Sequence, residues 1–459
     1  MKKTFLLSCL MLAAMPVMAA YTGHVYVDKN KNGVFDQSEK PLAGIKVSDG
    51  LNVVETAADG SFTLPGHERE RFIFITTPSG YKTFNRHYHK IEKKQSGYDF
   101  GLIPYSGRIR KDGSHRYIHI TDTEIFNTEN HADWVNNVHD YARNEQAAFI
   151  IHTGDLCYEK GLKAHIKLMN TENMDCPVFY CIGNHDLVKG KYGEELFESI
   201  YGPVYYSFDA GNVHYVVTPM SGGDHAPGYT SDDVCRWLKN DLAHIRPGTP
   251  VVVFNHDLLT YEDTFIFKSK NAGSINLNEY NLKAWVYGHW HINYMKKQGD
   301  VYSVCTSSLD KGGIDHSTTA FRVMHVDSKG DFTSELRYTY LDKNICIASP
   351  AGVMASGVLP VAVNVYSSVS PVREVLYTCL ADGKPVLKNK RLLQSTDWSW
   401  NGELPLSHKY VGKELTLRVT ARFNNGEIAE AESNFICRTE KTVPLFSADW
   451  DNLSGNAKH

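Results

Sequence analysis

The chain of 459 residues has no long hydrophobic run after its first twenty residues. No later stretch approaches the ~20 apolar residues that a membrane-spanning helix needs, so the sequence has no clear membrane-spanning feature. A strong charge of one sign is also lacking, because the formal net charge is -4. Together with the absence of an aromatic–basic stripe, this gives no clear nucleic-acid feature. We expect a globular chain of two to four domains, without repeats of solenoid length.

Cysteine follows no recognisable pattern in this sequence. Eight cysteines remain after Cys9, and their spacings match neither a metal-binding motif nor a disulfide scaffold. Cys379 and Cys437 share the last predicted domain and could form a disulfide. Free buried thiols are the alternative that the sequence leaves open.

The first twenty residues have the pattern of a secretory signal. Lys2 and Lys3 precede an apolar core over residues 5–15, and small residues surround a cleavage point at 17–19. Cys9 follows a segment that resembles a lipobox, but only a short apolar stretch precedes it. We therefore expect a signal peptide over residues 1–20 and a periplasmic or secreted protein, rather than a lipid-anchored one.

Strand and helix patterns divide the remaining chain into three parts. Residues 21–105 read as an N-terminal β domain of short strands with Gly, Asp and Pro turns. Residues 107–340 mix strands with helices predicted over 131–145 and 231–245, and with a hairpin turning at 209–212. Thr230 or Ser231 is available to cap the second helix. Strands return over 345–447, and the final dozen residues read as a frayed tail.

The N-terminal domain contains an oxygen-rich loop, DKNKNGVFDQSE. Its oxygen-bearing residues have the spacing of an EF-hand calcium loop, and Gly33 permits the sharp turn. The flanking segments are predicted strands, so the segment is not an EF-hand. A solvated Asn/Asp turn without an ion is the alternative. The possible calcium ligands are Asp28, Asn30, Asn32, Asp36 and Glu39.

Five apolar runs in the middle part end in a side chain that can bind a metal ion. Ligand sites of open α/β sheets form beyond the carboxyl ends of strands, so five such ends would bring these groups to one crevice. Carboxylate, amide and imidazole ligands without thiolate suit Mn, Fe or Zn. The groups are Asp122 after YIHIT, Asp155 after AAFIIHTG, Asn184-His185-Asp186 after CPVFYCIG, His256 after VVVFN, and His289-Trp290-His291 after KAWVYG.

This ligand set predicts a dinuclear centre of two divalent or mixed-valence transition metals. Two metals roughly 3.5–4 Å apart can hold both ends of an in-line displacement and lower the pKa of a bound water towards ~7. Phosphate esters benefit most, because their charged oxygens need cationic partners. The sequence therefore predicts a hydrolase that acts on a small phosphate-ester substrate.

The order D…GD…GNHD…H…GHxH resembles the calcineurin-like metallophosphoesterase superfamily over residues 107–340. The flanking β domains resemble those of secreted bacterial members. The resemblance implies an α/β (α+β) fold: a β-sandwich flanked by helices, with N-terminal and C-terminal all-β (Ig-like) domains. It also implies hydrolysis of phosphate mono- or diesters, with the β domains free to meet a cell-envelope partner.

The same resemblance assigns roles to the motif residues. Asp122, Asp155 and His291 would hold the first metal, and Asp155 would bridge to the second. His185 would face the substrate as general acid or phosphate stabiliser, oriented by Asp186. The ligands of the second metal would be Asp155, Asn184, His256 and His289.

One motif departs from the family pattern. The first motif is usually D-x-H, but here Glu124 replaces the histidine. Either Glu124 ligates, or the first site is weakened, or Tyr158 takes its place, since Asp155 to Tyr158 matches the GDxxY motif of purple acid phosphatases. An aromatic residue at position 158 could equally be packing. A cell-surface binding protein with a degenerate domain is the alternative function, and Glu124 is its support.

Three further residues lie near these motifs in the sequence. Lys311 lies in a polar segment over 307–317 that either contacts phosphate or forms a turn. His119 and His152 lie inside predicted strands, where we expect core or supporting roles rather than metal ligation.

Overall fold

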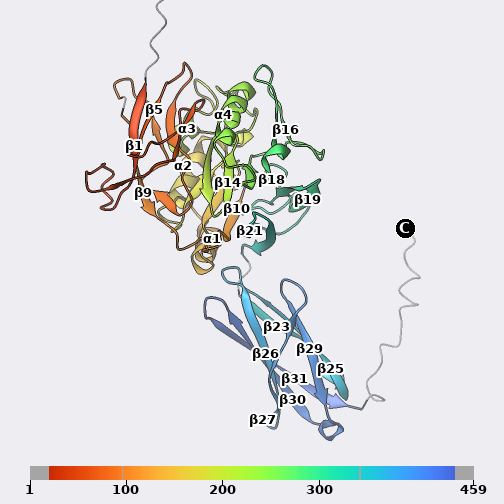
Figure 1. Ribbon diagram of the computed structural model, residues 1–459. Helices are drawn as coiled ribbons and strands as arrows, with labels where there is room; N and C mark the ends of the chain where they lie inside the picture. The colour runs from red at the N-terminus through yellow and green to blue at the C-terminus, as the bar shows by residue number, and fades with distance from the viewer. Residues whose placement is uncertain (1–19, 96, 341–342, 440–459) are drawn as a thin grey trace, which may run out of the picture.

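The computed structural model describes residues 20–95, 97–340 and 343–439. Residues 1–19 of the predicted secretory signal, with Cys9, and the predicted frayed tail lie outside the described residues. Three groups of strands follow one another along the chain, at the top left, centre and bottom of Figure 1. No helix in the described part of the chain combines the length and hydropathy needed to cross a membrane.

The middle group forms two β-sheets. In the first sheet the strand order is β12-β11-β10-β21-β22, and β10, β11 and β12 run parallel. In the second the order is β13-β14-β15-β18-β20-β19, with β14, β15, β18 and β20 parallel. The bounds are β10 His115–Ile120, β11 Phe149–His152, β12 Val178–Tyr180, β13 Tyr206–Ala210, β14 Val213–Val217, β15 Val251–Phe254, β18 Leu282–Tyr287, β19 Tyr294–Gln298, β20 Val301–Cys305, β21 Ala320–Val326 and β22 Phe332–Tyr338.

An aromatic core fills the space between the two sheets. Phe149 of the first sheet packs edge-to-face on Tyr215 of the second, with ring centroids 4.9 Å apart. Phe254 stacks on the same tyrosine at 5.6 Å. Buried aromatic rings contribute large apolar areas, so this layer is the main stabilising contact between the sheets. The middle domain is thus a β-sandwich.

Helices cover the outer faces of the sandwich. The long predicted helices are confirmed as α1 (Ala132–Asn144) and α4 (Ser231–Ala243), and the periodicity missed α2 (Tyr158–Leu168) and α3 (Glu195–Tyr201). Thr230 caps α4 by accepting a hydrogen bond from the backbone N–H of Asp233. The predicted buried face of α1 is confirmed: Trp134, Val138, Tyr141 and Ala142 are all buried.

Short elements complete the middle domain. The predicted hairpin is confirmed, because β13 and β14 pair antiparallel around residues 211–212. A two-stranded ribbon leaves the sandwich at β16 (Ile266–Phe267) and β17 (Ile275–Asn276). The short helices are η1 (Asn184–Asp186), η2 (Leu277–Tyr280) and, in the last strand group, η3 (His408–Tyr410).

The N-terminal strands form two small sheets. One has the order β2-β1-β9-β7 with β5 on β1, and the other has the order β4-β3-β6-β8. The bounds are β1 Tyr21–Val27, β2 Lys40–Pro41, β3 Lys46–Ser48, β4 Val53–Glu55, β5 Ser61–Leu64, β6 Phe72–Ile75, β7 Tyr81–Thr83, β8 Tyr88–Lys90 and β9 Phe100–Pro104.

The N-terminal strands share a hydrophobic core with the middle domain. Phe72 and Phe74 of β6 belong to the same buried cluster as Trp237 of α4, and the rings of Phe74 and Trp237 are 6.3 Å apart. The backbone N–H of Asp209 donates to the carbonyl of Thr77, which joins β13 to the N-terminal part. The two parts therefore bury apolar surface in common.

The C-terminal strands have a hydrophobic core of their own. They form a sheet of order β23-β25-β29-β28 and a sheet of order β24-β31-β30-β26-β27. The side-chain amide of Asn144 donates to the carbonyl of Val369, at the α1 end of the sandwich (Figure 1). The bounds are β23 Asn344–Ser349, β24 Gly352–Ala355, β25 Gly357–Tyr366, β26 Val372–Ala381, β27 Lys384–Arg391, β28 Leu393–Gln394, β29 Ser399–Leu406, β30 Glu414–Phe423 and β31 Ile428–Arg438.

The cysteines of the described residues are all unpaired. Cys379 and Cys437 lie buried in the C-terminal core as free thiols. Of the two alternatives that the sequence left open, the structure has the free-thiol form.

Candidate metal centre

The carboxyl ends of five strands bring the predicted ligands together. Asp155 follows β11 and His256 follows β15, and Oδ2 of Asp155 lies 3.1 Å from Nε2 of His256. The amide oxygen of Asn184, after β12, lies 3.2 Å from the same nitrogen. The ligand atoms of Asp155, His256 and His289 all lie within 4.8 Å of one another. Side chains from both sheets therefore converge on Asp155.

A second half of the cluster gathers around Asp122. Its Oδ1 lies 3.3 Å from Nε2 of His291, and its carboxylate accepts a hydrogen bond from the backbone N–H of His289. Oδ1 also lies 3.9 Å from Nε2 of His256. The hydroxyl of Thr121 donates to Oδ2 at 2.7 Å. Asp122 is fully buried, so its carboxylate is fixed among the imidazoles.

His256 has the orientation of a metal-binding imidazole. Its Nδ1 lies 2.7 Å from the carbonyl of Thr153, which accepts the Nδ1 proton. That contact fixes the tautomer and leaves Nε2 directed at Asp155 and Asn184. The imidazole is fully buried, so it cannot turn away without breaking this bond.

Buried carboxylates make the cluster strongly attractive for cations. Burial disfavours the charged form of His256, but the carboxylate of Asp155 outweighs this effect and raises the pKa of His256 to about 9. Contact with Asp122 and with Glu124 raises the pKa of His291 to about 10. Burying a carboxylate without a positive partner costs free energy. Metal ions that bind nitrogen and oxygen donors can supply the positive charge. The residues therefore fit a metal-binding site.

Glu124 lies inside the cluster. Its Oε1 is 3.4 Å from Nε2 of His291. The ligand atoms of Glu124, Asp155 and Cys157 all lie within 4.8 Å of one another. Its other oxygen forms an ion pair with Lys311. Contact with His291 and Lys311 lowers the pKa of Glu124 to about 2, so the side chain is ionised at neutral pH. Lys311 thus lies at the edge of the site and faces Glu124.

Tyr158 is the first residue of α2 and is half exposed. Its ring lies 5.4 Å from the ring of His185 and stacks on Phe126 at 6.4 Å. Its side chain is 44% exposed, in contrast to the buried ligands. These contacts place Tyr158 at the mouth of the site beside His185, where the side chain can meet a substrate.

The prediction that Asp186 orients His185 is wrong. The carboxylate of Asp186 accepts hydrogen bonds from the backbone N–H groups of Asp155, Cys157 and Gly183, each at 2.9 Å. It is fully buried and closes the two metal-binding loops on each other. The reason is local: in the short helix η1 the side chain of Asp186 is fully buried, while that of His185 is 34% exposed.

Asp224 is the acidic partner of His185. Its Oδ2 lies 2.9 Å from Nδ1 of His185, and this contact raises the pKa of His185 although desolvation opposes the charge. The backbone N–H of Asp224 donates to the carbonyl of Asn184. The sequence analysis missed this residue, because Asp224 lies seven residues beyond the end of β14 and not directly after a strand.

The motif glycines are required by close packing. A Cβ on Gly183 would lie 2.2 Å from Oδ1 of Asp155, and a Cβ on Gly288 would lie 1.9 Å from the hydroxyl of Thr121. Neither carboxylate loop can move away, because each is held by the hydrogen bonds described above. These contacts explain why glycine precedes Asn184 and His289.

Backbone strain is concentrated at the same place. Seven of the sixteen non-glycine residues with positive φ among the described residues belong to this cluster or its loops. Such conformations are uncommon and persist where surrounding contacts impose them. The seven are Asp122, Glu124, Asp155, Cys157, Tyr158, His289 and His291.

His119 and His152 support the cluster from within the strands. Both are fully buried, and His119 pairs with Thr153 and Thr306 at 2.8 and 2.9 Å. Nε2 of His152 lies 3.1 Å from the hydroxyl of Thr123. Desolvation lowers the pKa of both imidazoles, so they are neutral supporting groups.

The predicted calcium loop is closed by its own hydrogen bonds. Asp28 accepts from the backbone N–H groups of Asn32 and Gly33, and Glu39 accepts from those of Lys29 and Asp36. The carboxylates of Asp28 and Glu39 are buried. The remaining side chains meet at one point, because Asn30 and Asn32 both donate to Oδ2 of Asp36.

Comparison with known proteins identifies two family models in this chain. Residues 115–293 match the model of the calcineurin-like phosphoesterases, and residues 29–104 match the model of their N-terminal region. Together the two matches cover more than half of the chain. All of the strand-end ligands up to His291 lie inside the first match.

Individual relatives are distant. Purple acid phosphatase 13 of Arabidopsis thaliana is 26% identical over 215 residues, which are 44% of this chain and 36% of that protein. The chain therefore spans about a third of this relative's length. The structure of an archaeal phosphodiesterase covers 48% of this chain and 99% of its own, with 13% identity and a TM-score of 0.25. Vacuolar protein sorting 29 of Cryptosporidium parvum covers 64% and 99%, with 10% identity and a TM-score of 0.26.

The β-sandwich and the strand-end ligand group agree with the family match over this part of the chain. Residues 115–293 are therefore a calcineurin-like phosphoesterase domain, and residues 29–104 match the N-terminal region of that family. This assignment favours an enzyme over the alternative of a degenerate binding protein.

Proposed function

We propose that the chain is an exported phosphoesterase that hydrolyses phosphate mono- or diesters at a dinuclear metal centre. The observation that carries the proposal is the convergence of carboxylates, an amide and imidazoles from five strand ends on Asp155. The mixed nitrogen and oxygen donors suit Mn, Fe or Zn. When bound, two such ions neutralise phosphate charge and supply a water of lowered pKa as nucleophile.

Asp155 is the proposed bridge between the two ions. Glu124 replaces the histidine of the family pattern in the first site, since its carboxylate already lies beside His291 and Asp155. The first set is Asp122, Glu124, Asp155 and His291, and the second is Asp155, Asn184, His256 and His289.

Tyr158 remains the alternative ligand of the first site. A phenolate bound to Fe³⁺ absorbs visible light strongly, so an iron-loaded protein would be coloured. With Glu124 as ligand, the protein is colourless and Tyr158→Phe keeps its metal content. A coloured protein that bleaches in Tyr158→Phe would transfer the assignment to Tyr158.

His185 and Asp224 form the proposed proton-donating pair. Asp224 accepts a hydrogen bond from Nδ1 of His185 and favours the protonated imidazole. The side chain of His185 is 34% exposed, so its second nitrogen can reach a leaving-group oxygen. Positioned acids contribute typically ~10²–10⁴-fold to a rate.

Hydrolysis of p-nitrophenyl phosphate and bis-p-nitrophenyl phosphate tests the proposal. The purified protein is supplemented in turn with Mn²⁺, Fe and Zn²⁺, and Asp155→Ala is the matched control. Turnover that disappears in Asp155→Ala supports the proposal, and the preferred compound distinguishes monoester from diester chemistry. Equal turnover in both proteins would refute it.

Export and an envelope partner are further parts of the proposal. The charged and apolar pattern of residues 1–20 supports a periplasmic or secreted location. The outer β domains are proposed to meet a cell-envelope partner. Fractionation of cells that produce the full chain tests the location, and recovery of the uncleaved chain in the cytoplasm would contradict it.

Calcium binding by the oxygen-rich N-terminal loop is the last part of the proposal. Buried Asp28 and Glu39, with three further oxygen donors on one loop, support the proposal. Calorimetric titration of the full chain with Ca²⁺ should show one site that Asp28→Ala removes. The absence of binding heat in the unsubstituted protein would refute it.

A further inference from the structure

A cavity lies between the N-terminal strands and the sandwich, away from the metal centre. Its volume is about 320 Å³, which is within the usual range of small-molecule pockets. It reaches Phe149 at the start of β11 and Val178 at the start of β12. Asp155 and Asn184 follow the opposite ends of these same strands. The cavity is therefore a separate site.

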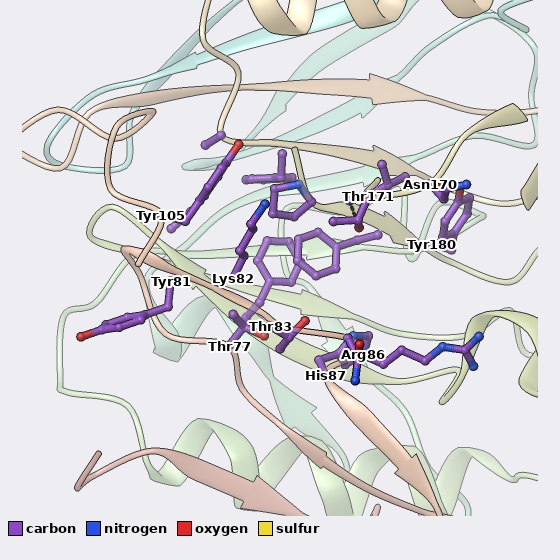
Figure 2. Close-up of a pocket in the computed structure, with 18 of the residues that line it drawn as sticks. Thr77, Tyr81, Lys82, Thr83, Arg86, His87, Tyr105, Asn170, Thr171 and Tyr180 are labelled. Atoms are coloured by element: carbon purple, nitrogen blue, oxygen red, sulfur yellow. Dashed lines mark hydrogen bonds between the residues drawn. The ribbon is translucent and has the colours of Figure 1, made fainter. Parts of the chain in front are cut away.

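One wall of this cavity is aromatic and comes from the sandwich. The rings of Phe179 and Phe208 stack with centroids 3.8 Å apart and planes 10° from parallel. Phe149 meets Phe208 edge-to-face at 5.0 Å. All three rings line the cavity, and Tyr105 stands at one side of it in Figure 2. A flat apolar ring would gain contact with this wall.

The facing wall is polar and comes from the N-terminal strands. Thr77, Lys82, Thr83 and His87 line it, as Figure 2 shows. Nε2 of His87 is buried and has no hydrogen-bond partner among the residues that the structure describes. Desolvation lowers the pKa of His87 to about 3, so the imidazole is neutral and packs against Tyr206 at 4.6 Å. A buried polar nitrogen without a partner is costly, and a ligand would relieve that cost.

Lys82 supplies a positive charge without a carboxylate partner among the described residues. Its ammonium lies 5.3 Å from the centre of the Tyr105 ring. The other charged side chains at the cavity either contact another residue already or lie at its rim. Arg86 donates to the hydroxyl of Tyr88, and Asp209 pairs with His214 at 2.7 Å. Glu172 is exposed at the rim and disfavours a ligand of high negative charge.

We propose that this cavity binds a small aromatic molecule that carries a single acidic group. The ring lies against Phe179 and Phe208, and the acidic group meets the ammonium of Lys82. The imidazole of His87 provides a hydrogen bond at the edge of the ring. Both walls are needed, so the site exists only in the chain that contains the N-terminal strands and the sandwich.

Two fluorescent probes with the same ring system test the proposal in the full chain. Anilinonaphthalene sulfonate is an aromatic monoanion, and phenylnaphthylamine lacks the sulfonate. Both should bind with one site per chain. Lys82→Met should weaken binding of the anion about tenfold, the scale of one charge-assisted hydrogen bond, and change the neutral probe less than about twofold. Lys90→Met, at an exposed lysine of β8, is the matched control and should change neither.

A second variant tests the cavity without removing a charge. Thr83→Trp fills the space between the walls, so it should weaken both probes by a similar factor. Thermal unfolding of each variant establishes that the protein is folded during the titration. Several weak sites per chain, equal effects of Lys82→Met and Lys90→Met, or full binding in a folded Thr83→Trp would each overturn the proposal.

Discussion

Removing the charge of Arg71 should destabilise the protein far more than removing that of its neighbour Arg69. The guanidinium of Arg71 lies 2.8 Å from a carboxylate oxygen of Glu194 and 2.7 Å from one of Glu198. Both carboxylates are buried, and Arg71 is the cation that pairs with each of them among the described residues. Desolvation raises the pKa of Glu198 to about 7 even with Arg71 in place.

Arg71→Met leaves two buried carboxylates without their cation. Breaking a buried ion pair by removing one partner costs about 3–5 kcal/mol. Protonation of Glu198 relieves the penalty, because its pKa in the folded protein lies above its ordinary value of 4.5. The destabilisation should therefore be smaller near pH 5 and grow as the pH rises through 7.

Urea unfolding at several pH values measures this loss, with Arg69→Met as the control. Arg69 pairs with Asp233 at 2.9 Å, but its side chain is 51% exposed, so its loss should cost about 0–1 kcal/mol. Equal costs for the two variants, or a cost in Arg71→Met that does not change with pH, would refute the reasoning.

Three further predictions concern the site and the core. Asp224→Asn should lower kcat by about tenfold or more. The metal content and the melting temperature should stay near those of the unsubstituted protein. Loss of metal would instead make Asp224 a structural residue of the metal centre. Gly183→Ala should remove metal and activity together, since its Cβ would lie 2.2 Å from an oxygen of Asp155; full metal content by elemental analysis would contradict this. His214 is fully buried between two carboxylates, which raise its pKa above the ordinary 6.5 against the effect of desolvation. Its charged form therefore stabilises the fold below about pH 6.5, and the difference in unfolding free energy from His214→Gln should shrink as pH rises through the raised pKa; a difference that grows with pH would show that the sign is wrong.

The residues of the metal cluster could be predicted because each one is identified by the local sequence around it. A short apolar run identifies a strand, and the side chain just beyond it lies at the edge of the sheet. Asp155 and His256 belong to different sheets, yet each obeys this rule and their side chains meet at 3.1 Å. The predicted crevice of one open sheet is in fact the common edge of two stacked sheets.

The acidic partner of His185 could not be predicted from the residues next to it in the sequence. Asp186 follows it directly, but the carboxylate of Asp186 is buried and bound to the backbone N–H groups of Asp155, Cys157 and Gly183. Asp224 reaches the imidazole from a loop 39 residues later in the chain. Only the folded loop brings the two together, since a local motif carries no information on such a distant partner.

Helix α2 was missed for a related reason. Only two of its four buried residues, Leu162 and Ala164, have apolar side chains, so its buried face lacks the large apolar residues that identified α1. The structure begins this helix at Tyr158, directly after the Gly154-Asp155 motif.

The shared core of the N-terminal strands and α4 has a consequence for synthesis. Phe74 leaves the ribosome about 160 residues before Trp237, its packing partner. At ~5–20 residues per second, the first strands wait on the order of 10–30 s before their apolar face can be covered. During that interval the nascent chain presents Phe72 and Phe74 to its surroundings, a period in which chaperones can hold it unfolded.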